Sequence, residues 1–175
     1  MVKTAVKRIY IGKYLVLGFI ALLVLGFVIY YAANASNRDE VRIKNVLTDL
    51  AGNLSKTPQE STATALLKVK SIAGAFDCPM TFGMDHYAAG SYDSDRLFAS
   101  VGRYRTLIKK ANVTASDISV ELLDKTRAKV FFSGRFAGEL KNGMSDTIIK
   151  DIEAEFIKIN KHWRIKSMKF RNVLH

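Results

Sequence analysis

Cysteine is almost absent from this chain, and histidine and glycine-rich motifs are scarce. Cys78 is the only thiol among 175 residues, so no disulfide can form within the chain and its stability has to come from burial. His86, His162 and His175 are scattered, and no cysteine or carboxylate lies at metal-ligand spacing from them. The chain also lacks a glycine-rich phosphate loop and a serine nucleophile elbow. We therefore expect no metal and no cofactor.

One long hydrophobic run lies near the N-terminus. Residues 14–33 carry no charge, and a helix of about that length crosses a hydrocarbon core about 30 Å thick. Basic residues precede the run while Tyr30 and Tyr31 end it, which predicts a cytoplasmic N-terminus. The sequence thus predicts a basic tail at residues 1–13, one transmembrane helix at residues 14–33 and a linker at residues 34–38. A domain at residues 39–175 would then lie outside the inner membrane, in the periplasm.

The same region allows a second interpretation. Ala33-Asn34-Ala35 fits the small-x-small pattern of a signal-peptidase site, and cleavage there would release the domain at Ser36. The apolar part of a signal peptide is usually about 7 to 15 residues long, which is shorter than this run. The uncleaved anchor is therefore favoured, with a freely secreted domain as the alternative.

Positive charge is in excess, with 27 Lys and Arg against 16 Asp and Glu and a formal net charge of +11. The predicted topology keeps the domain away from nucleic acid, so we expect anionic lipid or an acidic partner instead. Six basic residues surround Trp163 and form a candidate docking patch, here called the C-terminal basic patch: Lys158, Lys161, Arg164, Lys166, Lys169 and Arg171. Alternatively, these charges only protect a sheet edge from aggregation.

Apolar residues recur every three or four positions in the first half of the domain. This spacing predicts amphipathic helices over residues 39–56, 57–74 and 91–110, with a short edge strand at residues 79–87. Thr57-Pro58 supplies an N-cap and a first-turn proline for the second helix. Ser91 or Asp93 can cap the third.

From Asn112 onward apolar and polar residues alternate, which is typical of half-buried strands. Strands are predicted around residues 118–122, 129–136, 151–156 and 163–170, the last with a bulge near Lys166-Ser167. Short connections favour an antiparallel sheet. With three-residue loops, the register places Lys129 between Glu121 and Glu155 on the outer face. The acidic residues at 151, 153 and 155 are then interpreted as a solvated charge ladder.

The order of elements resembles the nuclear-transport-factor-2-like, or SnoaL-like, family over about residues 39–174. The resemblance rests on the AGSYDSDRL turn into the third helix and on the final hairpin, INKHWRIKSMKFRNVL. It implies an α+β cone of about three helices packed on a curved antiparallel sheet, with a mouth that can hold a small ligand and an outer sheet face that often forms dimers. Enzymes of this family place an acidic residue or His, often with a Tyr, inside the cone. The candidates here are Asp77, His86, Tyr87, Tyr92 and Tyr104.

None of these five residues lies in a catalytic motif of the family, which favours binding over catalysis. The leading hypothesis is a single-pass, membrane-anchored binding or assembly module of the bacterial envelope. Its periplasmic cone domain would contact a protein partner or form a homodimer through the outer sheet face. The alternative is a membrane-tethered small-molecule-binding protein or isomerase- or cyclase-type enzyme that uses the cone interior. An interior filled wholly by Phe, Leu and Met side chains would exclude this alternative.

We predict that the mature protein keeps its hydrophobic run, because residues 14–33 are long enough to remain as an anchor. Intact-mass measurement of the protein purified from membranes should include residues 1–35, and the protein should resist extraction with alkaline carbonate. A mature chain that begins at Ser36 and is recovered in the soluble fraction would contradict the anchor.

Overall fold

The computed structural model describes residues 37–84 and 90–172, together with Val24 and Gly26. The chain divides into two compact units, Met1–Asp39 and Glu40–His175. Almost all of the predicted span at residues 14–33 lies outside the described residues. Within the described part of the chain, no helix is long and apolar enough to cross a membrane. The fold described below is that of the second unit.

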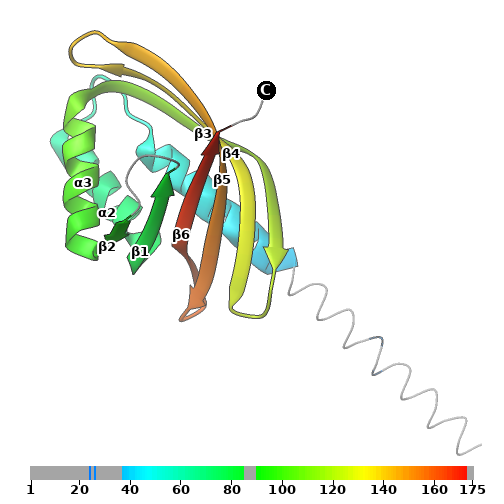
Figure 1. Ribbon diagram of the computed structural model, residues 1–175. Helices are drawn as coiled ribbons and strands as arrows, with labels where there is room; N and C mark the ends of the chain where they lie inside the picture. The colour runs from blue at the N-terminus through cyan, green and yellow to red at the C-terminus, as the bar shows by residue number, and fades with distance from the viewer. Residues whose placement is uncertain (1–23, 25, 27–36, 85–89, 173–175) are drawn as a thin grey trace, which may run out of the picture. The chain divides into compact units, whose positions relative to one another are not determined.

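Three helices and a six-stranded sheet make up the described part of this unit (Figure 1). One helix spans residues 37–54, most of which belong to the unit. The labelled helices are α2 (Thr62–Gly74) and α3 (Ser94–Leu107). The strands are β1 (Phe76–Met84), β2 (Gly90–Tyr92), β3 (Ile108–Leu122), β4 (Arg127–Leu140), β5 (Ser145–Ile159) and β6 (His162–Asn172), in the sheet order β2-β1-β6-β5-β4-β3.

The sheet is mixed, whereas the sequence predicted an antiparallel one. Strands β3 to β6 form the predicted antiparallel meander, but β1 pairs with β6 in parallel, with Phe82 opposite Met168. The prediction was wrong for this pair because it considered only strands that follow each other through short loops. Since α3 and four strands separate β1 from β6 along the chain, no tight turn constrains their direction. β1 is also not an edge strand, because β2 pairs with its other side.

The register of the meander agrees with the prediction. Lys129 lies opposite Glu121 on β3 and opposite Glu155 on β5. Gly143 has a φ of +88° in the loop between β4 and β5, the left-handed conformation that such a loop requires. The predicted bulge in β6 is also confirmed, because Lys166 has no counterpart where the register shifts between Glu155 and Phe156.

Two helix boundaries differ from those predicted. α2 begins after Ser61, whose hydroxyl accepts a hydrogen bond from the Thr64 amide at 3.2 Å, so Pro58 lies in the preceding turn and not in the helix. Asp93, one of the two predicted caps, caps α3. Its carboxylate lies 2.7 Å from the Arg96 amide. The helix ends at Leu107, and residues 108–110 already belong to β3.

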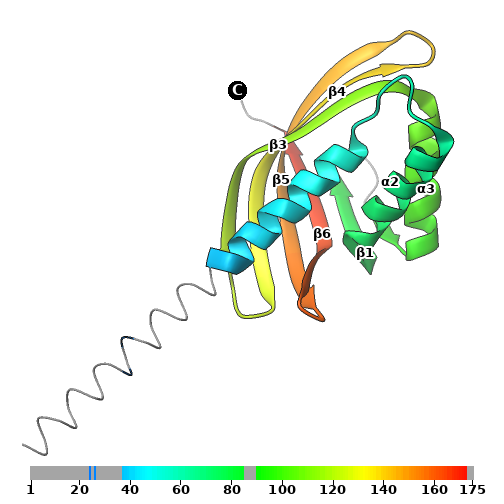
Figure 2. The same cartoon turned by 180° about the vertical axis from the view of Figure 1, so that it is seen from behind.

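The helices pack on the concave face of the curved sheet, and Figure 2 shows the helix of residues 37–54 running across that face. Alternation along β4 and β5 turns even-numbered residues of both strands toward the helices, among them Val130 and Phe156. The largest fully buried side chains are Phe156, Ile43, Leu47, Met80, Ile108, Ile165 and Val130. One continuous hydrophobic core thus joins the helices to the sheet.

Substituting Ile165 with alanine should destabilise the domain by about 2 to 5 kcal/mol, because the deleted atoms are fully buried and leave a void. Ile149→Ala is the matched control, since its side chain is 52% exposed, and it should cost no more than about 0.5 kcal/mol. Urea unfolding of the full chain in detergent, followed by the fluorescence of the buried Trp163, measures both. Equal losses in the two variants would contradict this assignment of the core.

Candidate functional site

A cavity of about 510 Å³ opens between the helices and the inner face of the sheet. The helix of residues 37–54 contributes Leu47, Leu50, Ala51 and Leu54, and α3 contributes Leu97, Ser100, Val101, Tyr104 and Arg105. The sheet supplies the floor: Met80, Phe82, Tyr92, Ile108, Val113, Thr114, Ala115, Phe132, Gly134, Arg135, Phe136, Ile148, Lys150, Ile152, Met168 and Phe170. Small-molecule sites have volumes of about 300 to 1,000 Å³ and mostly apolar walls, and this cavity fits both criteria.

One row of inward positions in the floor combines two small residues with a lysine. Ala115 on β3 lies opposite Gly134 on β4, and Gly134 lies opposite Lys150 on β5. A Cβ at Gly134 would come within 2.7 Å of the Ile152 side chain, so the glycine lets Ile152 lean over it. Large side chains occupy the rows on either side. The interior is therefore not filled wholly by Phe, Leu and Met, the condition that would have excluded a ligand-binding cone.

Two of the five predicted pocket residues, Tyr92 and Tyr104, line the cavity. Tyr92 packs edge-on against Phe82, with ring centroids 6.2 Å apart, and Tyr104 packs against Phe136 at 6.4 Å. Burial raises the pKa of Tyr104, so its hydroxyl stays protonated at neutral pH and can donate a hydrogen bond. Both aromatic side chains thus contribute to the cavity wall, and Tyr104 is also 49% exposed.

Of the other three predicted pocket residues, the structure describes Asp77. It is not among the lining residues of the cavity, and its carboxylate forms an ion pair with Lys166 at 2.9 Å. His86 and Tyr87 lie outside the described residues. Next to Asp77, burial and the charge of that carboxylate raise the pKa of the Cys78 thiol, which favours the unreactive thiol over the thiolate.

Three lining residues carry positive charge, Arg105, Arg135 and Lys150, while the described lining includes no carboxylate and no histidine. The three cations differ in what they offer the cavity. Lys150 lies on β5 between Ile148 and Ile152, so it shares their inward face. Arg135 follows Gly134 and has the opposite parity, so its side chain leaves from the outer face.

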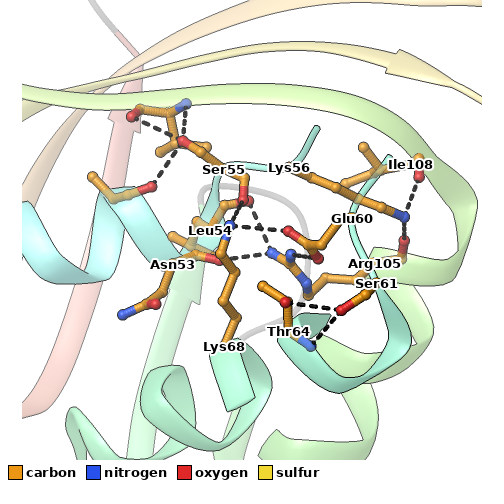
Figure 3. A network of polar contacts seen from close by, with 12 residues as sticks. Asn53, Leu54, Ser55, Lys56, Glu60, Ser61, Thr64, Lys68, Arg105 and Ile108 are labelled. Atoms are coloured by element: carbon orange, nitrogen blue, oxygen red, sulfur yellow. Dashed lines mark hydrogen bonds and ion pairs between the residues drawn. The ribbon is translucent and has the colours of Figure 1, made fainter. Parts of the chain in front are cut away.

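Arg105 is the third cation, and its guanidinium is held in a buried network (Figure 3). Only 4% of the residue is exposed, and one terminal nitrogen forms an ion pair with Glu60. The other donates to the backbone oxygens of Asn53 at 2.7 Å and Leu54 at 3.2 Å, the last carbonyls of the first helix. A cation at this end of a helix also interacts favourably with the helix dipole. Arg105 therefore ties α3 to the end of the helix of residues 37–54.

Further contacts extend this network to β3. Lys68 reaches Glu60 at 2.9 Å, and Lys56 donates to the backbone oxygens of Arg105 and Ile108, both at 2.7 Å. Burial alone would raise the pKa of Glu60, but hydrogen bonds and charges from Lys68 and Arg105 outweigh it and hold the pKa below its usual value. The pKa of Lys56 is also lowered, and here burial is the main cause. The network thus joins the helix of residues 37–54, α3 and β3, each of which lines the cavity.

Much of the C-terminal basic patch is engaged within the domain. Lys166 pairs with Asp77, Arg171 pairs with Glu153 at 2.7 Å, and the Lys158 ammonium lies 5.3 Å from the centre of the Trp163 ring. Glu153 was predicted to be solvated, but it is only 8% exposed. A hydrogen bond from Lys129 lowers its pKa despite the effect of burial, and the charges of Lys129 and Arg171 add to that. Docking of the patch on lipid or on an acidic partner stays a prediction.

Comparison of the sequence with models of known families and with curated proteins finds no match. Solved structures do match. A proposed scytalone dehydratase from Novosphingobium aromaticivorans superposes with a TM-score of 0.69 at 11% identity, over 81% of this chain and 89% of that chain. A hexachlorocyclohexane dehydrochlorinase from Novosphingobium barchaimii gives 0.64 at 10% identity, over 79% and 89%. A protein of unknown function from Mycobacterium tuberculosis gives 0.62 at 15% identity, over 82% and 76%.

The domain has the nuclear-transport-factor-2-like cone fold. At identities this low the likeness shows the fold alone, and it confirms the cone that the sequence predicted. The predicted antiparallel sheet is corrected to a mixed one.

Replacing Glu60 with glutamine should destabilise the protein by about 3 kcal/mol at neutral pH, because the buried Arg105 loses its counter-charge. The pKa of Glu60 is depressed in the folded state, so its contribution is present above the unfolded value of about 4.3 and is lost as the pH falls through the lower folded pKa. The gap between wild type and variant in urea unfolding should therefore close in acid.

Glu40→Gln provides the control for this measurement. Its carboxylate pairs with Lys44 on the surface, with both side chains 41% exposed, so the substitution should cost no more than about 0.5 kcal/mol. A pH-independent gap for the Glu60 variant would show that the ion pair is not its cause.

Proposed function

We propose that this domain binds a small molecule with a largely apolar body inside the cone. The observation that carries the proposal is the cavity of about 510 Å³, whose walls are mainly aliphatic and aromatic. Each methylene group that a ligand moves from water into such a site contributes about 0.8 kcal/mol, so an apolar body of modest size supplies useful affinity. The hydroxyls of Tyr92 and Tyr104 would orient a polar group of the ligand.

The core beside the cavity is closely packed. This supports a genuine binding site and not a loosely packed interior. Protein interiors rarely leave voids larger than a water molecule. Beside the cavity, Ile43, Met80, Val130 and Ile165 are each 0% exposed, so the core around it is closely packed. Ala115 and Gly134 are small residues of the floor, and the Ile152 side chain lies over Gly134.

Binding is a better supported role than proton transfer. Isomerase-type chemistry needs a base within hydrogen-bond reach of the substrate and a donor opposite it. Tyr104 can serve as a donor, but the described lining residues include no carboxylate or imidazole to act as the base. The similar structures include proteins described as a dehydratase and a dehydrochlorinase, which supports use of a cone interior for small molecules and does not transfer their reactions to this chain.

The membrane anchor and the external partner remain proposals. The uncharged run at residues 14–33 supports a tether that holds the domain at the inner membrane on its periplasmic side. The hollow interior supports ligand binding more directly than the assembly role that the sequence favoured. A protein partner or a homodimer on the outer sheet face has no comparable support from the described residues.

Partly filling the cavity should weaken ligand binding without disturbing the core. We expect Ala115→Phe, which adds a ring to the cavity lining, to weaken binding of the neutral fluorescent probe N-phenylnaphthylamine at least about tenfold, since the probe and the ring compete for one volume. The measurement uses the full chain in phosphatidylcholine nanodiscs, with the signal of empty discs subtracted.

The matched control is Asn112→Phe, three residues earlier on β3, where the side chain is exposed and does not line the cavity. It should bind the probe as the wild type does. Unchanged probe affinity in Ala115→Phe, with an unchanged urea midpoint, would overturn the proposal.

A further inference from the structure

Large apolar side chains are exposed around the mouth of the cavity. Two of them, Tyr104 and Ile148, also line the cavity. Two more lie beside them, at the end of α3 and in the loop between β4 and β5. The four residues, each between 42% and 65% exposed, are called the mouth surface below: Tyr104, Leu107, Met144 and Ile148. Apolar residues exposed singly are normal, whereas a contiguous group marks a site of interaction.

Contacts between α3 and the β4–β5 hairpin make the mouth surface continuous. The Tyr104 ring packs against Phe136, whose partner on β5 is Ile148. The amide of Lys141, in the loop that also carries the fourth residue of the surface, donates to the backbone oxygen of Leu107 at 2.9 Å. Figures 1 and 2 both show the tip of this hairpin at the end of the domain where α3 ends. The exposed apolar residues therefore extend from the cavity onto the tip of the hairpin.

Exposed basic residues border the mouth surface. Arg103 on the last turns of α3 and Lys141 in the loop are both exposed. The hairpin also carries two acids near its tip, but Glu139 forms an ion pair with Lys109, which leaves Asp146. The border therefore has a positive net charge, which is complementary to a surface of anionic headgroups.

The sequence before the domain favours a bilayer as the surface that the mouth meets. Residues 14–33 carry no charge and are long enough for an anchor, and residues 34–39 join them to the domain. Six residues span at most about 20 Å, so a bilayer would stay within reach at a high effective concentration. Tyrosine is favoured at the headgroup level, and leucine, methionine and isoleucine gain by leaving water there.

We propose that the mouth surface docks on the anionic face of the bilayer that holds the anchor, with the loop between β4 and β5 among the headgroups. An apolar ligand would then pass between the bilayer and the cavity without crossing water. The inference rests on the anchor proposed above and goes beyond ligand binding, because docking does not require that the cavity is filled.

The test places a tryptophan at either end of β4 in the full chain. Met144→Trp reports on the mouth surface, and Leu123→Trp is the matched control, since it is 52% exposed in the loop at the other end of β4. Both are measured in nanodiscs whose phosphatidylcholine carries bromine on its acyl chains, with phosphatidylglycerol added. Bromine quenches a tryptophan that reaches the bilayer. The emission of the buried Trp163 is subtracted with the wild type.

Met144→Trp should lose most of its added emission, and Leu123→Trp should keep its own. Discs without phosphatidylglycerol, or added salt, should weaken the quenching. In the Met144→Trp chain, Lys141→Gln should lower the ratio of docked to undocked domain about fivefold, the effect of one base near an anionic surface. Lys125→Gln makes the same change in net charge at the other end of β4 and should leave the quenching unchanged.

The outcomes separate docking from the proposed function. If Met144→Trp is not quenched, or Leu123→Trp is quenched as strongly, docking through the mouth surface is wrong, whether or not N-phenylnaphthylamine binds. If Met144→Trp is quenched and the probe does not bind, docking stands and the proposed function fails.

A second copy of the chain is the alternative occupant of the mouth surface. A blue shift of the Met144→Trp emission that appears only in discs with two chains, without quenching by bromine, would show a contact between copies and overturn the inference. A chain that does not stay in discs would remove the anchor and the inference with it. Should Met144→Trp change the urea midpoint, Leu107→Trp reports on the same surface.

Discussion

The buried ion pair between Glu60 and Arg105 is the contact on which the shape of the site depends. It comes from a turn and from α3, two segments that lie 45 residues apart in the chain, and it is completed by the last carbonyls of the helix of residues 37–54. Ser55 adds a hydrogen bond from the Val113 amide to its hydroxyl at 2.9 Å, so the same corner also holds β3. A buried pair gains little net stability over an apolar contact, but it is specific in geometry. Here that geometry holds two helices and a strand around a cavity without filling it.

The local part of the fold could be predicted from the sequence because the pattern of alternation is local. The register of β3 to β5 followed from keeping the apolar face of each strand on the same side of the sheet. Once Lys129 is placed opposite Glu155, counting along the two antiparallel strands also puts Gly134 opposite Lys150. The small row in the floor was thus within reach of the sequence. The pattern gave no sign of the parallel pairing of β1 with β6, since that contact joins strands with no short connection.

The site was harder to predict than the fold because a cavity is a property of what surrounds it. Tyr92 and Tyr104 were found through a family resemblance, whereas Lys150, which also lines the cavity, was not among the predicted residues. Whether Lys150 lines the cavity depends on the direction in which β5 faces and on how far the helices stand from that row, and the second of these is set by tertiary contacts such as those of Arg105. The start of α2 was mispredicted for a similar reason. Pro58 favoured a helix that begins near it, but residues 57–60 form a turn, and Glu60 in that turn pairs with Arg105.

Charge is used differently on the two faces of the sheet. On the outer side, Glu153 lies between Lys129 and Arg171, and these charges lower its pKa, so basic residues there serve to neutralise a buried acid. On the inner side, the described residues that line the cavity are mostly apolar and include no carboxylate. If residues 14–33 anchor the domain, apolar molecules that partition into the adjacent bilayer would reach the cavity at high local concentration, so the tether and the cavity would serve one task.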